Sequence, residues 1–293
     1  MFCKFETQTH GKWVLAGEHA VLRGNAALAF PLKEKELCLD YEPNTSTLKA
    51  DFEGTVCDEL RLLFWSVLEH GQHLCSGSLK QLSGKFQLRS NIPIGVGLGA
   101  SAALCVAVSR WFASQKIIGT KGIFLFAKEL EHLFHGKSSG LDIAAVSSES
   151  GVYFQQGTVK TVEKNWHPHW YLSSSEQIGM TSHCIMQVNK LWEKQPSLAQ
   201  NVDSDMQKAV VQAQAALKDL GSQALHNLKE AIDTAEQCFN TWGLVDGALS
   251  AHLCILKDQG ALAVKPTGSG SGGYALSLWK DIPPNLPFPL IKL

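Results

Sequence analysis

The stretch at residues 93–104 constrains the fold of this chain more than any other. It reads Pro-Ile-Gly-Val-Gly-Leu-Gly-Ala-Ser-Ala-Ala-Leu, so three glycines at alternate positions run into a block of small helix formers. Glycine permits backbone angles closed to other residues and lets a ligand approach the main chain. A helix that begins here offers unpaired N–H groups and the positive end of its dipole. The pattern predicts an anion cradle, most often one for phosphate.

A flexible glycine linker is the alternative interpretation of this stretch. A flexible linker is rich in serine and other polar residues, whereas Ile92, Ile94, Leu98 and Leu104 flank or interrupt these glycines. We therefore expect a packed turn.

The chain on either side of the loop supports this expectation. Phe86 and Leu88 alternate with polar neighbours and predict a strand that leads into the loop. Residues 100–113 are apolar almost all round, which predicts a buried helix. The local order is strand, phosphate-type loop and buried helix.

Composition excludes several classes of protein. With 293 residues and 45% hydrophobic content, the chain can bury one large core or two ordinary ones. A net charge of −1 gives no sign of an electrostatic nucleic-acid binder. The eight cysteines form no C-x-x-C pair and favour a reducing compartment. With no signal peptide and no apolar run of about 18 residues, we expect a cytoplasmic protein without a membrane or nucleic-acid partner. Its partner would be a small-molecule substrate, and a homodimer stays open.

Charged residues bracket a short apolar run near the N-terminus. Gly11-Lys12 precedes the predicted strand at 13–16, and Gly17-Glu18-His19 follows it. These side chains could face a common cleft or could be ordinary surface charge. Further on, apolar residues at helical spacing predict a helix over 56–68.

A second candidate region follows a helix predicted over 121–135. His132 and His135 have the i, i+3 spacing of a metal pair, but no Cys or third His lies at ligand spacing nearby, so we do not expect a zinc site. Asp142 follows a turn rich in glycine and serine. It could cap a helix or serve in acid–base chemistry, and spacing cannot separate the two.

The pattern changes in the second half of the chain. A hairpin at 152–162 and a strand at 170–174 give way to four successive helices, one of which Ser222 is expected to cap. The change predicts one domain over 1–177 and another over 178–293. A second glycine loop at 265–273 could be a long hairpin tip or a second backbone approach to phosphate.

The three motifs in this order resemble those of the GHMP kinases. The first is similar to Gly11–Gly24, the second to Pro93–Ala103 and the third to Lys265–Gly273. Lys12, the Gly-Glu-His-Ala-Val run and the segment 135–142 look most like the mevalonate kinase branch of that family.

The resemblance implies a fold and an activity. The fold would be α+β in two domains, a ribosomal S5 domain 2-like N-terminal domain and a ferredoxin-like C-terminal domain. The activity would be transfer of the γ-phosphoryl group of ATP, with Mg²⁺, to a hydroxyl acceptor, with mevalonate favoured. Phosphomevalonate kinase or another small-molecule kinase of the family is the alternative. A non-catalytic protein of this fold that binds a metabolite is the candidate from a different class.

The resemblance also implies roles for individual residues. Asp142 would accept the proton of the substrate hydroxyl, and Lys12 would interact with that carboxylate and offset charge on the transferred group. Mg²⁺ would be held by Ser101 and by Glu131, which lies eleven residues before Asp142. The expected ATP-binding residues are Pro93, Gly95, Val96, Gly97, Leu98, Gly99, Ala100, Ser101, Gly268 and Gly270. The residues expected to bind the acceptor are Lys12, Glu18, His19, Asp142, Thr181, Ser182 and Thr267.

The chain departs from the family pattern at a few positions. Ala100 stands where many relatives have the first of two serines, and Ser138 replaces a proline common before the Ser-Gly pair. Glu149-Ser150-Gly151 replaces a usual Gly-Gly. None of these changes removes Lys12 or Asp142.

Overall fold

The structure, a computed structural model, describes residues 2–54, 57–78, 82–136 and 138–293. It divides into two compact units, each built from three separate segments. The first unit comprises residues 1–12, 31–94 and 98–149, and the second comprises residues 13–30, 95–97 and 150–293. Strands β1 (Phe5–Ala16) and β2 (Ala27–Thr47) each contribute residues to both units.

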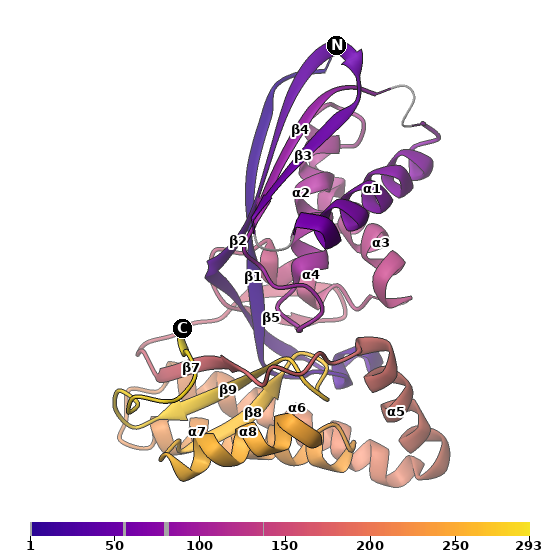
Figure 1. The fold of residues 1–293 in the computed structure, drawn as a ribbon. Coiled ribbons are helices and arrows are strands. Elements are labelled where there is room, and N and C mark those ends of the chain that lie inside the picture. Colours follow the sequence, from indigo (N-terminus) through magenta and orange to yellow (C-terminus); the bar gives the residue numbers. More distant parts are fainter. Residues whose placement is uncertain (1, 55–56, 79–81, 137) are drawn as a thin grey trace. The chain divides into compact units, whose positions relative to one another are not determined.

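The first unit contains the longer part of a twisted sheet (Figure 1). Strand β2 pairs antiparallel with β4 (Ser83–Ser90), which places Leu39 opposite Leu88 and Tyr41 opposite Phe86. Strand β3 (Lys49–Gly54) pairs with β4 in parallel, and β1 pairs with β2. Alternation of side chains along these strands puts the apolar set on one face.

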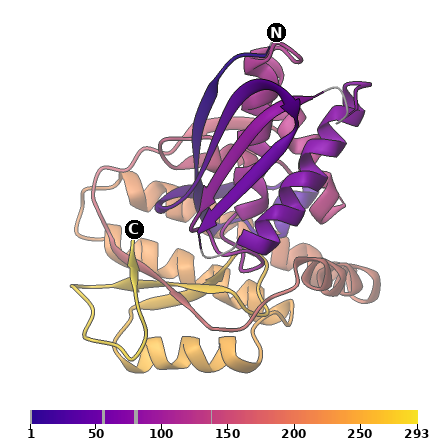
Figure 2. The same ribbon diagram turned by 45° about the horizontal axis from the view of Figure 1, so that its top comes forward.

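Helices cover that apolar face (Figure 2). They are α1 (Cys57–Leu74), α2 (Ala100–Ser114), α3 (Ile123–His135), which follows a short 3₁₀ helix at Thr120–Gly122, and α4 (Leu141–Val146). Tyr41, Phe86 and Trp111 meet in a fully buried aromatic cluster, with ring centroids 4.7–5.3 Å apart. Helix α2 is buried over most of its length, as its apolar sequence predicts.

The second unit carries its own four-stranded sheet. Its order is β10 (Ile291–Lys292), β7 (His169–Ser174), β9 (Tyr274–Trp279) and β8 (Ala263–Thr267), all antiparallel. The helices of this unit are α5 (Thr181–Lys194), α6 (Pro196–Lys218), α7 (Ala224–Thr241) and α8 (Gly247–Asp258). Helices α7 and α8 lie along one face of the sheet (Figure 1).

The remaining elements of the second unit lie within residues 13–30 and at the start of the segment 150–293. A 3₁₀ helix at Ala20–Arg23 follows β1, and the first residues of β2 pair with β5 (Val152–Gln155), which forms a hairpin with β6 (Thr158–Thr161). Trp13 stacks on Phe30 at 4.7 Å and meets Trp170 edge-on at 4.9 Å. This aromatic contact joins chain segments that are far apart in the sequence into one core.

The predicted elements are confirmed in kind, with differences at their ends. Strands β1 and β2 run well beyond the short apolar runs that signal them, because half-exposed strand residues are as often polar as apolar. Residue 56, the predicted start of the first helix, lies outside the described residues, and α1 continues to Leu74, beyond the predicted end at residue 68. Ser222 does not cap α7: the flanking residue is Gln223, and no side chain among the described residues forms a capping bond there.

The compact units also differ from a division of the chain at residue 177. That division is contiguous, whereas each unit draws on three segments, because β1 and β2 pass from one unit into the other. As a boundary between family domains, 177/178 stays a prediction.

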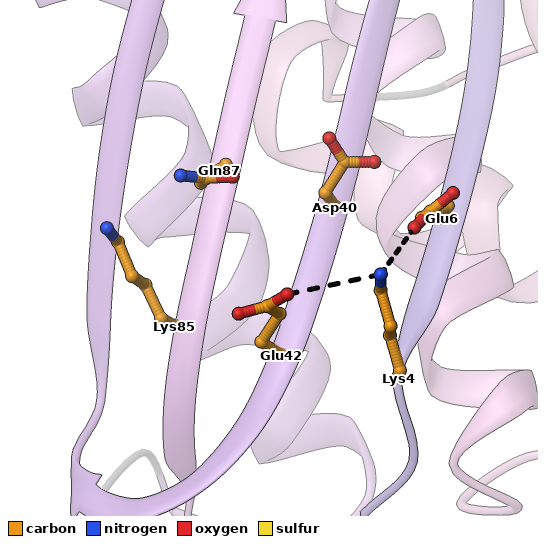
Figure 3. A pocket seen from close by; sticks show the side chains of 6 residues that line it. All are labelled: Lys4, Glu6, Asp40, Glu42, Lys85 and Gln87. Carbon is orange, nitrogen blue, oxygen red and sulfur yellow. Dashed lines mark ion pairs between the residues drawn. The ribbon is translucent and has the colours of Figure 1, made fainter.

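A shallow pocket lies on the sheet of the first unit, lined by charged residues (Figure 3). Lys4 contacts Glu6 at 3.0 Å and Glu42 at 4.0 Å, and Lys85 pairs with Asp51 at 2.6 Å. Neighbouring carboxylates raise the pKa of Lys4. Exposed pairs of this kind contribute little stability, and none of the candidate residues lines this pocket. No helix within the described part of the chain is long and apolar enough to cross a membrane.

Candidate functional site

The glycine loop leads directly into helix α2, as predicted. Gly99 has a φ of +79° and immediately precedes the helix, and a Cβ atom there would lie 2.7 Å from Cγ of Lys12. Only glycine fits both the backbone angle and the space. No described side chain caps the helix start, so the first N–H groups remain available to an anion. Ser101, the second residue of α2, is half-buried.

In the first unit, strand β1 brings a lysine to a carboxylate. Lys12 Nζ lies 3.0 Å from Asp142 Oδ2, with the lysine side chain 3% exposed and that of Asp142 30% exposed. The N–H of Lys12 donates to the carbonyl of Leu98 at 2.9 Å, which fixes this strand to the glycine loop. Asp142 lies in the first turn of α4, just after Gly140. The turn holds the carboxylate rigidly while leaving it accessible.

Glu131, on α3, lies in the same unit and is almost completely buried. Burial, with the charge of Asp142 acting in the same direction, raises the pKa of Glu131 to about 8. The Ser138 hydroxyl donates to its Oε2, while Oε1 is buried with no hydrogen-bond partner among the described residues. A buried carboxylate oxygen without a partner is costly, so this site favours a bound proton or a cation.

In the second unit the two predicted glycine loops lie against each other. A Cβ atom on Gly97 would lie 3.2 Å from the carbonyl oxygen of Thr267, and one on Gly273 would lie 2.6 Å from that of Val96. A Cβ atom on Gly268 would lie 3.1 Å from Cα of Gly97. The backbones of two segments about 170 residues apart in the sequence therefore lie side by side in the second unit.

Glu18 follows β1 and pairs with a lysine inside the second unit. Its carboxylate lies 2.5 Å from Nζ of Lys265, and both side chains are buried. Lys265 also donates to the carbonyl of Val14 at 3.3 Å and lies 5.2 Å from the centre of the Phe239 ring. The acceptor role expected of Glu18 stays a prediction, and the structure pairs its carboxylate with Lys265.

His19 adopts an unusual backbone conformation beside this pair. Its φ is +56°, a region that residues other than glycine enter rarely and mostly at functional sites. Its Nε2 lies 2.8 Å from the carbonyl of Ser269, and its ring meets that of Trp242 edge-on at 5.1 Å. Burial lowers the pKa of His19 to about 4. The imidazole is neutral at pH 7 and donates through Nε2, since a carbonyl can only accept.

The remaining expected acceptor residues also lie in the second unit. The hydroxyl of Thr267 accepts the Val14 N–H at 2.8 Å and donates to the Val14 carbonyl at 3.1 Å, so its observed contacts tie β8 to β1. Thr181 begins α5, with its hydroxyl 3.4 Å from that of Ser269, and Ser182 beside it is exposed. Gly270 accepts the thiol of Cys184 at 3.5 Å.

The candidate residues thus fall into two groups, one in each unit. The first holds Lys12, Pro93, Leu98–Ser101, Glu131 and Asp142, and the second holds Glu18, His19, Gly95–Gly97, Thr181, Ser182, Thr267, Gly268 and Gly270. Sequence reasoning did not assign a role to Lys265 or Ser138. A lysine beside an apolar strand signal is a usable clue, because buried lysines are nearly always paired.

Among the described residues, no group of three or more His, Cys, Asp or Glu side chains is placed to hold a metal ion. His132 contacts Glu129 at 3.3 Å on the surface of α3. The buried carboxylate of Glu131, whose Oε1 has no hydrogen-bond partner among the described residues, is of the kind that Mg²⁺ uses when phosphates and water supply most of its ligands.

The chain is similar to known proteins both in a part of its sequence and in its fold. Residues 63–150 match the family model described as the GHMP kinases N terminal domain. A crystal structure of Leishmania (L. major) mevalonate kinase in complex with R-mevalonate matches with a TM-score of 0.79 at 20% identity, covering 96% of this chain and 89% of that one. The chain has the two-domain α+β fold of the GHMP kinases, and its resemblance to them is confirmed.

The chain is also similar in sequence to proteins named mevalonate kinase. The mevalonate kinase of Pyrococcus horikoshii is 24% identical over 292 residues, which cover 91% of this chain and 86% of that protein. The mevalonate kinase of Thermococcus sibiricus is 28% identical over 211 residues, 68% of this chain but only 61% of that protein, so this match spans less than two thirds of the relative. A Streptococcus pneumoniae phosphomevalonate kinase, in complex with phosphomevalonate and AMPPNP, matches with a TM-score of 0.72 at 19% identity, covering 94% of this chain and 92% of that one.

Proposed function

We propose that the protein transfers the γ-phosphoryl group of ATP to the hydroxyl of a small molecule, with mevalonate as the favoured acceptor. The observation that carries the proposal is the contact of Lys12 with Asp142 beside the glycine loop. A phosphotransferase that acts on a hydroxyl group agrees with the family model and with the names of the relatives. Kinases of this chemistry need the protein mainly for positioning and charge neutralisation.

Each group of the first unit suits one part of that reaction. The N–H groups at the start of α2 hold donor phosphates, and the Asp142 carboxylate takes the proton from the attacking hydroxyl. Lys12, whose ammonium is held beside Asp142, keeps this carboxylate oriented and offsets negative charge on the group in transfer. The small exposed part of Asp142 is enough for a substrate oxygen to reach it.

The metal that such a reaction requires fits the residues present. The buried Oε1 of Glu131, which has no hydrogen-bond partner among the described residues, would be an anionic ligand, and the Ser101 hydroxyl at the start of α2 would be a neutral one. Mg²⁺, when bound, neutralises charge on the phosphates. Few protein ligands suffice because Mg²⁺ keeps several waters and phosphate oxygens.

Residues of the second unit suit recognition of the acceptor. His19 is neutral and has a second ring nitrogen that accepts a hydrogen bond, as an uncharged hydroxyl substrate needs. Thr181 and Ser182 add hydroxyls at the start of α5. Glu18 and Thr267 support these residues through their contacts with Lys265 and Val14.

A phosphorylated acceptor, the alternative, would need additional cationic side chains. Arg23, a cation within the first motif, binds Asp203 through two nitrogens, at 2.5 and 2.6 Å, and lies over the Trp192 ring. Lys137, a cation of the segment 135–142, lies outside the described residues. The bidentate contact of Arg23 favours the unphosphorylated acceptor.

An acceptor panel tests the proposal. Purified protein with Mg-ATP should phosphorylate mevalonate in preference to phosphomevalonate, homoserine and sugars. Asp142→Asn should lower kcat by about 10²–10⁴, because a general base contributes about that much, while AMP-PNP binding is retained. Asp233→Asn, which alters only a surface pair with Lys229, is the matched control. Turnover of none of these acceptors would contradict the proposal, and unaltered turnover in Asp142→Asn would contradict the assigned base.

A further inference from the structure

The turn between α3 and α4 contains a hydroxyl that the family pattern does not supply. Ser138 is 7% exposed and occupies the position where the pattern has a proline. Its Oγ donates to Oε2 of Glu131 and accepts the N–H of Gly140 at 3.0 Å. The proton and a lone pair of this hydroxyl are therefore both committed, which fixes its orientation.

The two oxygens of Glu131 differ as a result. Oε2 is held by Ser138, whereas Oε1 is buried and has no partner among the residues that the structure describes. A long side chain such as glutamate has several rotamers, so a hydrogen bond to one oxygen selects the direction in which the other faces. Hydrogen bonds to ligating carboxylates orient them for metal in this way.

We propose that Ser138 is a positioning residue that holds Glu131 with its Oε1 directed toward the metal of a bound metal–nucleotide complex. The inference rests on the proposed function, because it needs a nucleotide with a divalent cation. Ser138 does not touch that cation; it acts through Glu131. The Ser138 hydroxyl orients Glu131 by donating a hydrogen bond to it. A proline at this position has no donor and could influence Glu131 only through the shape of the turn.

The neighbouring serine provides a matched control within the same turn. The hydroxyl of Ser139 accepts the N–H of Leu141 at 3.1 Å, in the manner in which Ser138 accepts that of Gly140. Ser139 is half-buried, and no hydrogen bond that the described structure gives it reaches Glu131. Loss of either hydroxyl removes one bond that shapes the turn, but only loss of Ser138 releases the carboxylate.

The experiment measures AMP-PNP affinity by calorimetry with and without Mn²⁺, so that turnover is not the readout. In the wild-type protein Mn²⁺ should tighten AMP-PNP binding, and Glu131→Gln should remove most of this gain. Ser138→Ala should reduce the gain about tenfold or more, in the range found when a second-shell partner is lost. Ser139→Ala should leave the gain unchanged, and Ser138→Thr should restore it. The Mn²⁺ EPR spectrum of the ternary complex should change in Ser138→Ala alone of the two alanine variants.

Two outcomes would overturn the inference. An unchanged gain in Ser138→Ala would show that Glu131 is positioned without the Ser138 hydroxyl, and equal losses in Ser138→Ala and Ser139→Ala would assign the effect to the turn. A wild-type protein that neither binds AMP-PNP nor transfers phosphoryl groups would instead refute the proposed function itself.

Discussion

At the scale of single residues, the candidate site depends on ionisable groups held in unusual states. Burial lowers the pKa of His19 to about 4, so that the imidazole is neutral at pH 7. Burial also raises the pKa of Glu131 to about 8. Lys12 and Asp142 form an ion pair. Such departures gather where a fold serves chemistry as well as stability. They also make stability depend on pH in a way that can be measured.

His19 predicts a loss of stability in mild acid. Its pKa is about 4 in the folded protein against 6.5 for a free side chain. Between those values the unfolded chain binds a proton and the folded chain does not, so stability falls as pH drops through this window. A shift of this size corresponds to about 3 kcal/mol.

His19→Asn should weaken that pH dependence, because asparagine tolerates a positive φ and does not titrate. Urea unfolding at pH 4.5 and pH 6.5 measures the difference for both proteins. The exposed His183 offers the control, since His183→Asn should leave the pH dependence as it is. Identical slopes in the wild type and His19→Asn would exclude the assigned shift.

Site residues that belong to a short sequence motif could be predicted from the sequence, whereas contacts between distant residues could not. The glycines before α2, Lys12 and Asp142 are marked by motifs a few residues long, and the structure places Lys12 against Asp142. The partners of Glu18 and Arg23 could not be found, because each is about 180 residues away or more and no local pattern specifies it. Burial, which sets the pKa of His19, is likewise a property of the folded chain.

At the scale of elements, strand β8 is joined to β1 and to the turn that follows it by polar contacts inside an apolar core. Lys265 and Glu18 form a buried ion pair, and Thr267 exchanges two hydrogen bonds with Val14. A buried ion pair adds little net stability compared with apolar residues of similar volume, but removal of one partner leaves the other charge buried and uncompensated. The pair therefore specifies which segments meet.

Lys265→Met should destabilise the protein by about 3–5 kcal/mol, because the Glu18 carboxylate would stay buried without the lysine charge beside it. The double variant Glu18→Gln/Lys265→Met should recover part of that loss. Lys229→Met is the control: Lys229 forms a surface pair on α7, and its loss should cost about 0.5 kcal/mol or less. Urea denaturation measures all three, and equal effects for Lys265 and Lys229 would argue against a buried pair.

At the scale of the whole molecule, the two compact units are interleaved along the chain. Composition allows one large core or two, and only the folded structure shows that residues 13–30 pack with residues beyond 150. The sequence places a change of pattern near residue 177 because strands give way to helices there. It could not show that β7, just before that point, pairs on both sides with strands from the last 30 residues.

Division of the chain at residue 177 should therefore leave neither piece with a cooperative fold. Residues 178–293 would lack β7, the strand between β10 and β9. Residues 1–177 would lose β9, with which β7 pairs, and the Thr267 of β8 that bonds Val14. Each fragment should unfold without a sharp urea transition, and co-expression of the two should restore one. A sharp transition for residues 178–293 alone would support the contiguous division.

The interleaving has a consequence for inheritance. Since each unit draws on three separated segments, a single crossover between two related genes cannot exchange one unit whole. A chimaera made at any one point receives parts of both units from each parent, and the two parents' side chains must then be compatible in every core they share. Variation in such a lineage is expected to accumulate by substitution within the existing frame, with shuffling of halves selected against.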